Sequence, residues 1–558
     1  MLLLKKRFFG MIVLFMLILN FGACSGGDDG DRGVFWAQNP TTEKYYQLRA
    51  DLLAEGKHCK VYVEQGLDLK KYNVPASSLE EMAEDVADEY DNGIYQIMID
   101  TFSVRSFTNP VNGKPADNVM EIPDSMTDGD GKLTILILDI KGASSGDAYV
   151  AGYFTPLNLF KNDSRDPYLK YSNECDMIYL NIYSGSNQGP GSLESNKTLA
   201  HEMQHMMCFA TDVLKRRTGN SLNQMDLWIN EGLSSAAEYV YSGQHSQERI
   251  NHYNNYTSPK TDIPYGNNFY VWGEKRGEYD YILDEYATVY LFFQWLRLQS
   301  SPPNGSLDNY NIYEKIIGST SYDQDAVVNA LKGKGNYVSD STLSWGTVLL
   351  DWFAANLLRY PITAQTPKGA IGGEPKYGYM GEPELSTGGR WVITTATKEI
   401  QLYPGEGVYS STPLAGAISY PGSGSYIRYA GVNIDFFSSP QTIYGDGTVN
   451  KSSKYANGLL ITYNIRTLYR YDDNYDPMSE KGYIANIVSM DTNFSLMGQS
   501  AFSIQSAKAM TYSNQDVASS NQAAVNPKKP HAISMGDMLR MNGHKDSGYD
   551  ITKIISEK

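Results

Sequence analysis

The segment His201-Glu202-Met203-Gln204-His205 restricts the fold of this chain more than any other part of its sequence. Two histidines four residues apart lie on one face of a helix, one turn apart, so both imidazoles can reach a single metal ion. Glu202 lies beside them, where a carboxylate can accept a proton from a water molecule whose pKa the metal lowers. The pattern predicts a zinc-binding helix, with His201 and His205 as ligands and Glu202 as general base.

The residues around this motif predict that its helix is buried. Apolar side chains cover nearly every face of it: Leu199, Ala200, Met203, Met206, Met207 and Phe209. Buried histidines without polar partners are costly. A metal site therefore fits this stretch better than a pair of solvent-facing histidines.

A zinc site that keeps one position open for water needs a third protein ligand. The spacing HExxHxxGxxH is absent, because Cys208 stands at the glycine position and Thr211 at the position of the last histidine. His245 and His252 lie in polar stretches that predict loops rather than a metal site.

The stretch Trp228-Ile229-Asn230-Glu231-Gly232-Leu233-Ser234 resembles the second helix of the glutamate-zincins, in which an Asn-Glu pair supplies the third zinc ligand. This resemblance implies that Glu231 completes the site, with Glu238 as the alternative ligand. The 25 residues between His205 and Glu231 are more than thermolysin has, but extra loop length costs little free energy. Alternatively, Glu231 is not a ligand but an ordinary acidic residue in the first turn of its helix, where a negative charge is favourable.

Further segments resemble the hyicolysin family of secreted bacterial zinc metallopeptidases, over residues 70–300. The matching segments are Gly131–Ile140, Ala151-Gly152-Tyr153-Phe154, Ser172-Asn173, Met177-Ile178-Tyr179 and Tyr286–Phe293. The last of them has Ala287-Thr288 where the family has a Gly-Ala pair. Tyr286 lies where glutamate-zincins offer a tyrosine hydroxyl to the developing oxyanion, which implies a catalytic role. Packing alone is the alternative for this tyrosine, one of 43 in the chain.

The zinc-binding histidines need hydrogen-bond partners that orient their rings. Thermolysin-like enzymes use an Asp four residues after the ligand Glu, and this chain has Ser235 at that place. Ser235 and Glu238 are both candidates for the role.

The N-terminus predicts export across a membrane. Lys5-Lys6-Arg7 precede an apolar run from Phe8 to Phe21, shorter than the ~20 residues of a membrane span and typical of a secretory signal. Cys24 follows small residues, as in the lipobox of bacterial lipoproteins, although Phe21 stands where those proteins prefer Leu. The resemblance implies a lipid-anchored protein of the bacterial cell envelope, outside the cytoplasm. Simple secretion is the alternative.

The net charge of −16 and the lack of a basic block argue against binding to nucleic acid through counterion release. Apart from Cys24, the chain has Cys59, Cys175 and Cys208, which allow at most one disulfide. Its stability therefore has to come from the burial of apolar side chains.

Hydrophobic periodicity predicts an α+β protein with a mixed sheet followed by helices. The predicted parts are a signal peptide at 1–24, a flexible tether at 25–33, an α/β region at 34–130, a zincin-like domain at 131–360 and an antiparallel β-rich domain at 361–558. The apolar run Leu133–Ile140 predicts a strand buried on both faces. Alternation with a period of two predicts the β-rich domain, in Arg390–Leu402, Gly424–Phe437 and Gly458–Tyr471.

These features together predict a zinc endopeptidase that hydrolyses extracytoplasmic proteins or peptides. An aminopeptidase is disfavoured, because the chain lacks the Gly-x-Met-Glu-Asn element with which that class holds the free amine of its substrate. The alternative is a non-catalytic surface lipoprotein, an adhesin-like binding protein with a structural zinc site. Glu202 favours the enzyme, because a structural site needs no general base.

Overall fold

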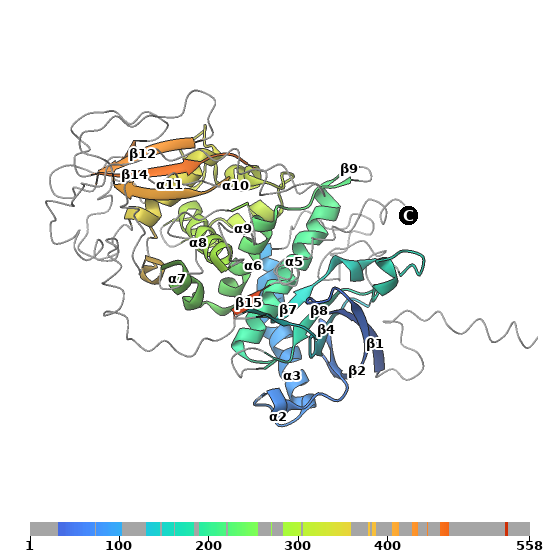
Figure 1. The fold of residues 1–558 in the computed structure, drawn as a ribbon. Helices are drawn as coiled ribbons and strands as arrows, with labels where there is room; N and C mark the ends of the chain where they lie inside the picture. The colour runs from blue at the N-terminus through green and yellow to red at the C-terminus, as the bar shows by residue number, and fades with distance from the viewer. Residues whose placement is uncertain are drawn as a thin grey trace, which may run out of the picture. The chain divides into compact units, whose positions relative to one another are not determined.

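The computed structural model describes a large part of the chain, shown in Figure 1. The described residues are 32–72, 74–102, 130–145, 148–160, 162–183, 189–218, 221–254, 269–270, 283–302, 305–358, 376, 378–379, 382–386, 404–411, 427–433, 443–444, 458–467 and 531–533. The predicted signal peptide, Cys24 and most of the tether lie outside them. Among the described residues, no helix combines the length and apolar character needed to cross a membrane.

The chain divides into two compact units. The first contains Met1–Ile99, Arg105–Met206 and Lys529–Lys558, and the second contains Asp100–Val104 and Met207–Lys528. The division falls inside helix α5 (Leu193–Lys215), so this one helix belongs to both units. The domain boundaries proposed from the sequence stay predictions.

The first unit is built on a mixed six-stranded sheet with the strand order β1-β2-β3-β4-β8-β7 (Figure 1). Its strands are β1 (Arg32–Gln38), β2 (Tyr45–Glu55), β3 (Cys59–Glu64), β4 (Leu133–Leu138), β8 (Met177–Asn181) and β7 (Gly152–Phe154). β2 pairs antiparallel with both β1 and β3, β4 pairs parallel with both β3 and β8, and β7 runs antiparallel to β8. All six residues of β4 are buried, as its continuous apolar run predicts.

Side-chain hydrogen bonds link the opposite ends of this sheet. The Tyr179 hydroxyl of β8 donates to the Trp36 carbonyl of β1 over 2.8 Å, and the Gln38 amide of β1 donates to the Tyr153 hydroxyl of β7 over 3.2 Å. Tyr153 and Tyr179 stack with ring centroids 4.1 Å apart. The sheet therefore curves so that β1 approaches β8 and β7, and tyrosines of these two strands partly satisfy the polar backbone of β1.

Helix α3 (Leu79–Glu89) packs against β2 and β3, and side chains at its N-terminus cap it. The Ser78 hydroxyl accepts the amide hydrogen of Glu81 over 3.1 Å, and the Glu81 carboxylate accepts that of Ser77 over 2.8 Å. Such reciprocal capping satisfies amides that have no partner within the helix. A π-helical turn, Tyr90–Ile94, and helix α4 (Tyr95–Phe102) follow.

A second, small sheet of the first unit joins distant parts of the chain. Its strands are β5 (Ser144–Ser145), β6 (Ala148–Val150) and β15 (His531–Ile533). β6 pairs antiparallel with β5 and parallel with β15.

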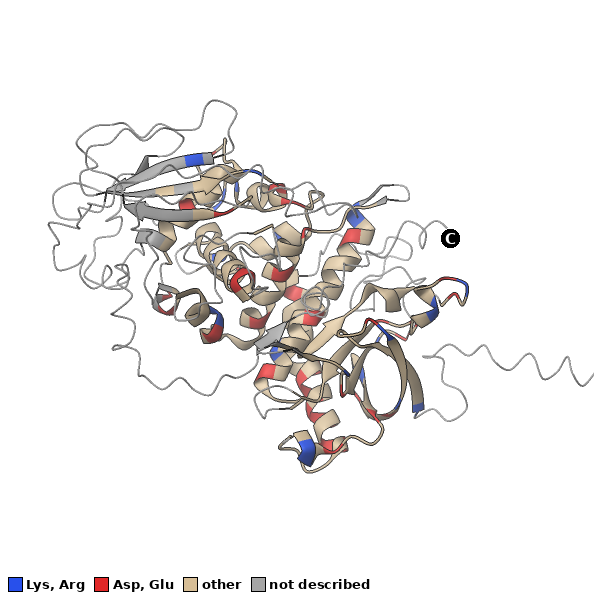
Figure 2. Cartoon of the chain, viewed as in Figure 1, with Lys and Arg blue, Asp and Glu red and all other residues tan. Residues whose placement is uncertain are grey.

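Acidic and basic residues are interspersed over the described elements (Figure 2), with ion pairs such as Lys132–Glu55 at 2.6 Å.

The second unit consists of helices around α8 (Leu283–Ser300), whose residues are all buried. The other helices are α6 (Leu227–Ser242), α7 (Gln247–Asn254), α9 (Ile312–Ile317), α10 (Gln324–Leu331) and α11 (Trp345–Leu358). α6 and α7 pack directly against α8 (Figure 1). Its aromatic core includes Trp228, Phe292 and Trp352, each with under 2% of its surface exposed.

A four-stranded antiparallel sheet also belongs to the second unit. Its order is β11-β14-β12-β13, with β11 (Gly407–Ser411), β14 (Gly458–Asn464), β12 (Ile427–Asn433) and β13 (Ile443–Tyr444). β12 and β14 lie within predicted segments, whereas the predicted strand at Arg390–Leu402 lies outside the described residues. The described fold is thus α+β, with a mixed sheet followed by helices.

The three cysteines within the described residues form no disulfide and are buried. Burial raises the pKa of the Cys59 thiol to about 12 and raises that of Cys208 as well. Both thiols are therefore protonated at neutral pH and act as small apolar side chains.

Candidate metal centre

His201 and His205 lie on helix α5, and both side chains are buried. Their exposed fractions are 6% and 9%, and their ring centroids are 4.8 Å apart. The flanking apolar residues are all buried as the sequence predicts: Leu199, Ala200, Met203, Met206, Met207 and Phe209. The i and i+4 spacing thus places two imidazoles side by side in a largely apolar setting.

Glu231 on α6 is 2% exposed and joins the two histidines in one cluster. One ligand atom from each of His201, His205 and Glu231 lies within 4.8 Å of the others. Glu238, the alternative third ligand, is not part of this cluster. It forms an ion pair with Arg249, in which Nη2 and Oε1 are 2.8 Å apart.

The donor set of this cluster fits a zinc ion. Two imidazole nitrogens and one carboxylate oxygen are zinc ligands in thermolysin-like metalloproteases and leave a fourth position for water. Ligand atoms in a tetrahedral zinc site are about 3.3 Å apart, so small side-chain movements bring the three atoms into that range. The cluster is a candidate His-His-Glu zinc site, as the HExxH motif and a distal Glu predict.

Glu202 is 5% exposed, and strand β7 holds its carboxylate. The Phe154 amide donates to Glu202 Oε2 over 2.9 Å. β7 comes this close because Gly152 has no side chain. A Cβ atom there would lie 2.7 Å from the Tyr179 carbonyl oxygen and 2.9 Å from Thr198 Cγ2. The backbone of an edge strand therefore orients the predicted general base.

A buried ion pair between Asp212 and Arg216, which was not predicted from the sequence, holds the connection between α5 and α6 in place. Asp212 accepts hydrogen bonds from Arg216 and from the Met225 amide, the latter over 3.2 Å. Arg216 also donates to the carbonyls of Ser319 and Ser321, at 3.1 and 3.3 Å, and to that of Ile317. Met225 lies just before α6, so the pair fixes the start of the helix that carries Glu231. The signal for this ion pair in the sequence was the spacing of four residues between Asp212 and Arg216 on one helix.

Gly232, next to Glu231, lets α6 approach α8 closely. A Cβ atom at Gly232 would lie 2.2 Å from Cε2 of Phe293, a fully buried residue of α8. Real contacts are never this short, so a larger residue would force the two helices or the ring to move. In the Asn-Glu-Gly sequence, Glu231 is thus the candidate ligand and Gly232 allows the close contact between α6 and α8.

Tyr286 lies on α8 and is 3% exposed. The guanidinium carbon of Arg249 is 5.3 Å from the centre of its ring. The Ser235 hydroxyl is buried and makes no hydrogen bond with another described residue. The roles assigned to Tyr286, Ser235 and Glu238 from the sequence stay predictions.

His245 belongs to a buried polar network. Its Nδ1 is 2.8 Å from the Tyr290 hydroxyl, its Nε2 is 3.0 Å from Glu382, and Arg297 is paired with the same carboxylate over 2.7 Å. Burial opposes the ionisation of Glu382, but His245 and Arg297 outweigh it and lower its pKa. Burial raises the pKa of Tyr290. This network stabilises the packing around α8.

The loop predicted around His252 is wrong, because this residue lies in helix α7. Its Nε2 is 2.6 Å from Asp284 Oδ1. Only Ile250 and Tyr253 of α7 carry large buried apolar side chains, so the short helix has little periodic signal. As predicted, neither His245 nor His252 belongs to the metal cluster.

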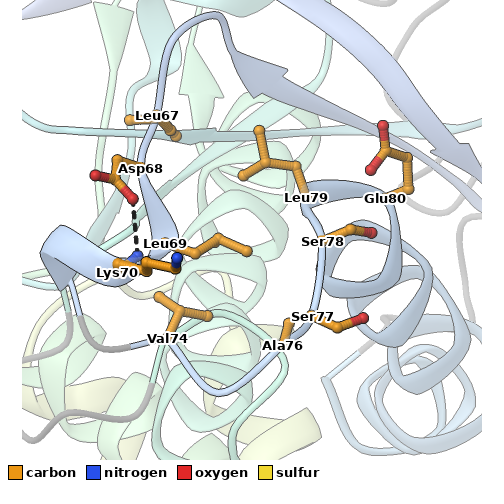
Figure 3. Close-up of a pocket in the computed structure, with 10 residues that line it drawn as sticks. All are labelled: Leu67, Asp68, Leu69, Lys70, Val74, Ala76, Ser77, Ser78, Leu79 and Glu80. Carbon is orange, nitrogen blue, oxygen red and sulfur yellow. Dashed lines mark hydrogen bonds between the residues drawn. The ribbon is translucent and has the colours of Figure 1, made fainter.

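The pocket drawn in Figure 3 is separate from these residues. It is lined by residues 67–70, 74 and 76–80, around α2 (Leu69–Tyr72) and the start of α3. The capping bonds of Ser77, Ser78 and Glu81 already use the polar groups at that helix end. None of the candidate site residues lines it.

Comparison with known proteins relates part of the chain to a metalloprotease. No protein-family model matches the chain. The chain is 28% identical over 313 residues to neutral metalloprotease ShpI of Staphylococcus hyicus, across 55% of this chain and 59% of that protein. It thus spans about three fifths of the length of this relative. The chain is a distant homologue of a neutral metalloprotease, and its cluster fits the HExxH-plus-Glu zinc set.

Proposed function

We propose that this homologue of a neutral metalloprotease is a zinc endopeptidase that hydrolyses extracytoplasmic proteins. The observation that carries the proposal is the convergence of His201, His205 and Glu231 within 4.8 Å, with Glu202 adjacent to His201 in sequence. The similarity to a metalloprotease over 313 residues supports the same reaction class.

Each residue of the site has its own role in peptide hydrolysis. His201, His205 and Glu231 would hold the zinc ion, which supplies a Lewis acid that polarises a carbonyl and lowers the pKa of water. Glu202, oriented by the Phe154 amide, accepts the proton of the attacking water and passes it to the leaving amine. Tyr286 donates its hydroxyl to the oxyanion that develops on the substrate carbonyl.

A non-catalytic zinc protein is the competing proposal. Structural zinc sites use four protein ligands, whereas the described residues bring three together, and Glu202 follows one of them directly in sequence. Casein hydrolysis by the purified chain, with and without a chelator, separates the two. The enzyme loses activity with the chelator and regains it with zinc, and a binding protein shows no hydrolysis under either condition.

We also propose that Cys24 carries a lipid that anchors the protein outside the cytoplasm, with residues 25–33 as the tether. The basic start, the apolar run and the small residues before Cys24 support this placement. Residues 361–558 are proposed as a β-rich domain beside the zincin-like domain, supported by the four-stranded sheet within them.

A further inference from the structure

Arg249 of α7 lies over two tyrosine rings of α8. Its guanidinium carbon is 5.3 Å from the centre of the Tyr286 ring and 5.8 Å from that of Tyr290. The two tyrosines are four residues apart and share one face of the helix. A cation within about 6 Å of an aromatic ring is attracted to its face, and the attraction grows as water is excluded. The Arg249 side chain is 16% exposed, so it is largely desolvated.

Glu238 fixes the position of this guanidinium. Arg249 Nη2 donates to Glu238 Oε1 over 2.8 Å, and the Glu238 side chain is also 16% exposed. Glu238 lies on α6, seven residues after the candidate ligand Glu231. Because the guanidinium is planar and rigid, a bond at one nitrogen restrains the whole group above the rings.

Tyr290 is held by other contacts as well. Its hydroxyl accepts the Ser246 amide hydrogen over 3.0 Å and lies 2.8 Å from His245 Nδ1. Removal of Arg249 would therefore leave Tyr290 anchored at its hydroxyl. Tyr290 is the natural control for an effect of Arg249 on Tyr286.

We propose that Arg249, held by Glu238, is a positioning residue for Tyr286. The proposal rests on the function proposed above, in which the Tyr286 hydroxyl donates to the oxyanion. Arg249 keeps the ring in the orientation that this hydrogen bond requires.

The test is a double-mutant cycle on peptide hydrolysis. We expect Tyr286→Phe to lower kcat by about 10²–10³-fold. Arg249→Met should lower kcat by roughly five- to thirty-fold with KM and zinc content unchanged, because the lost cation–aromatic contact is worth about 1–2 kcal/mol. In the Tyr286→Phe background, Arg249→Met should change kcat little. Arg249→Lys should restore part of the loss, and Tyr290→Phe should leave the effect of Arg249→Met intact.

Two results would overturn this assignment. One is an equal effect of Arg249→Met with and without the Tyr286 hydroxyl, and the other is full activity of Tyr286→Phe. Activity that still requires zinc and Glu202 would leave the proposed hydrolysis standing in either case. If Arg249→Met does not fold, Glu238→Gln replaces it in the cycle, since it releases the guanidinium without removing it. An equal effect of Glu238→Gln in both backgrounds overturns the assignment too.

Discussion

Replacement of Asp212 by Asn should be among the most destabilising single changes in α5. The Arg216 side chain is fully buried and that of Asp212 is 5% exposed. Removing one partner of a buried ion pair costs about 3–5 kcal/mol, because the other charge stays buried. Arg216 keeps its bonds to the carbonyls of Ser319 and Ser321, so we expect a loss of about 3 kcal/mol, at the lower end of that range.

A matched control lies on the same helix. Glu194 pairs with Lys197 over 3.0 Å, but the Glu194 side chain is 54% exposed. Glu194→Gln should therefore cost less than about 1 kcal/mol. Hydrogen exchange of the zinc-free protein is the suitable assay, because it gives the free energy of opening at α5 and α6 separately. An equal cost for Asp212→Asn and Glu194→Gln would refute the reasoning.

Three further changes test other parts of the structure. Gly232→Ala should lower the stability of α6 by about 1–3 kcal/mol, because its Cβ meets Phe293, and Phe293→Leu should relieve part of the loss in a denaturation experiment. Glu231→Ala should release zinc on dialysis far more readily than Glu238→Ala, and the reverse ranking would move the third ligand to Glu238. Cys24→Ala should abolish the incorporation of labelled palmitate in cells, and equal labelling would rule out the proposed anchor.

The sequence predicts those features that depend on local pattern. The burial of Leu199–Phe209 in α5 follows from apolar residues on nearly every face of the helix, and the strand β4 follows from one continuous apolar run. The His-His-Glu cluster was predictable from two short motifs, the second through its resemblance to known enzymes. Motif and periodicity therefore suffice where neighbouring residues carry the information.

Features built from distant residues were not predictable in this way. The pairing of β15 with β6 joins His531–Ile533 to Ala148–Val150, and no local pattern marks strands as partners at such separation. Arg216 binds backbone carbonyls about 100 residues away, which every sequence offers. The position of Arg249 over Tyr286 likewise depends on how α7 packs against α8.

In the proposed reaction, Glu202 is the base of a zinc-dependent hydrolysis. The most direct test of this role compares zinc content and peptide turnover in the wild-type protein and in Glu202→Gln. We expect one zinc ion per chain in both proteins and a loss of kcat of about 10²–10⁴-fold in the variant. Near-wild-type turnover by Glu202→Gln, with zinc still bound, would contradict this role.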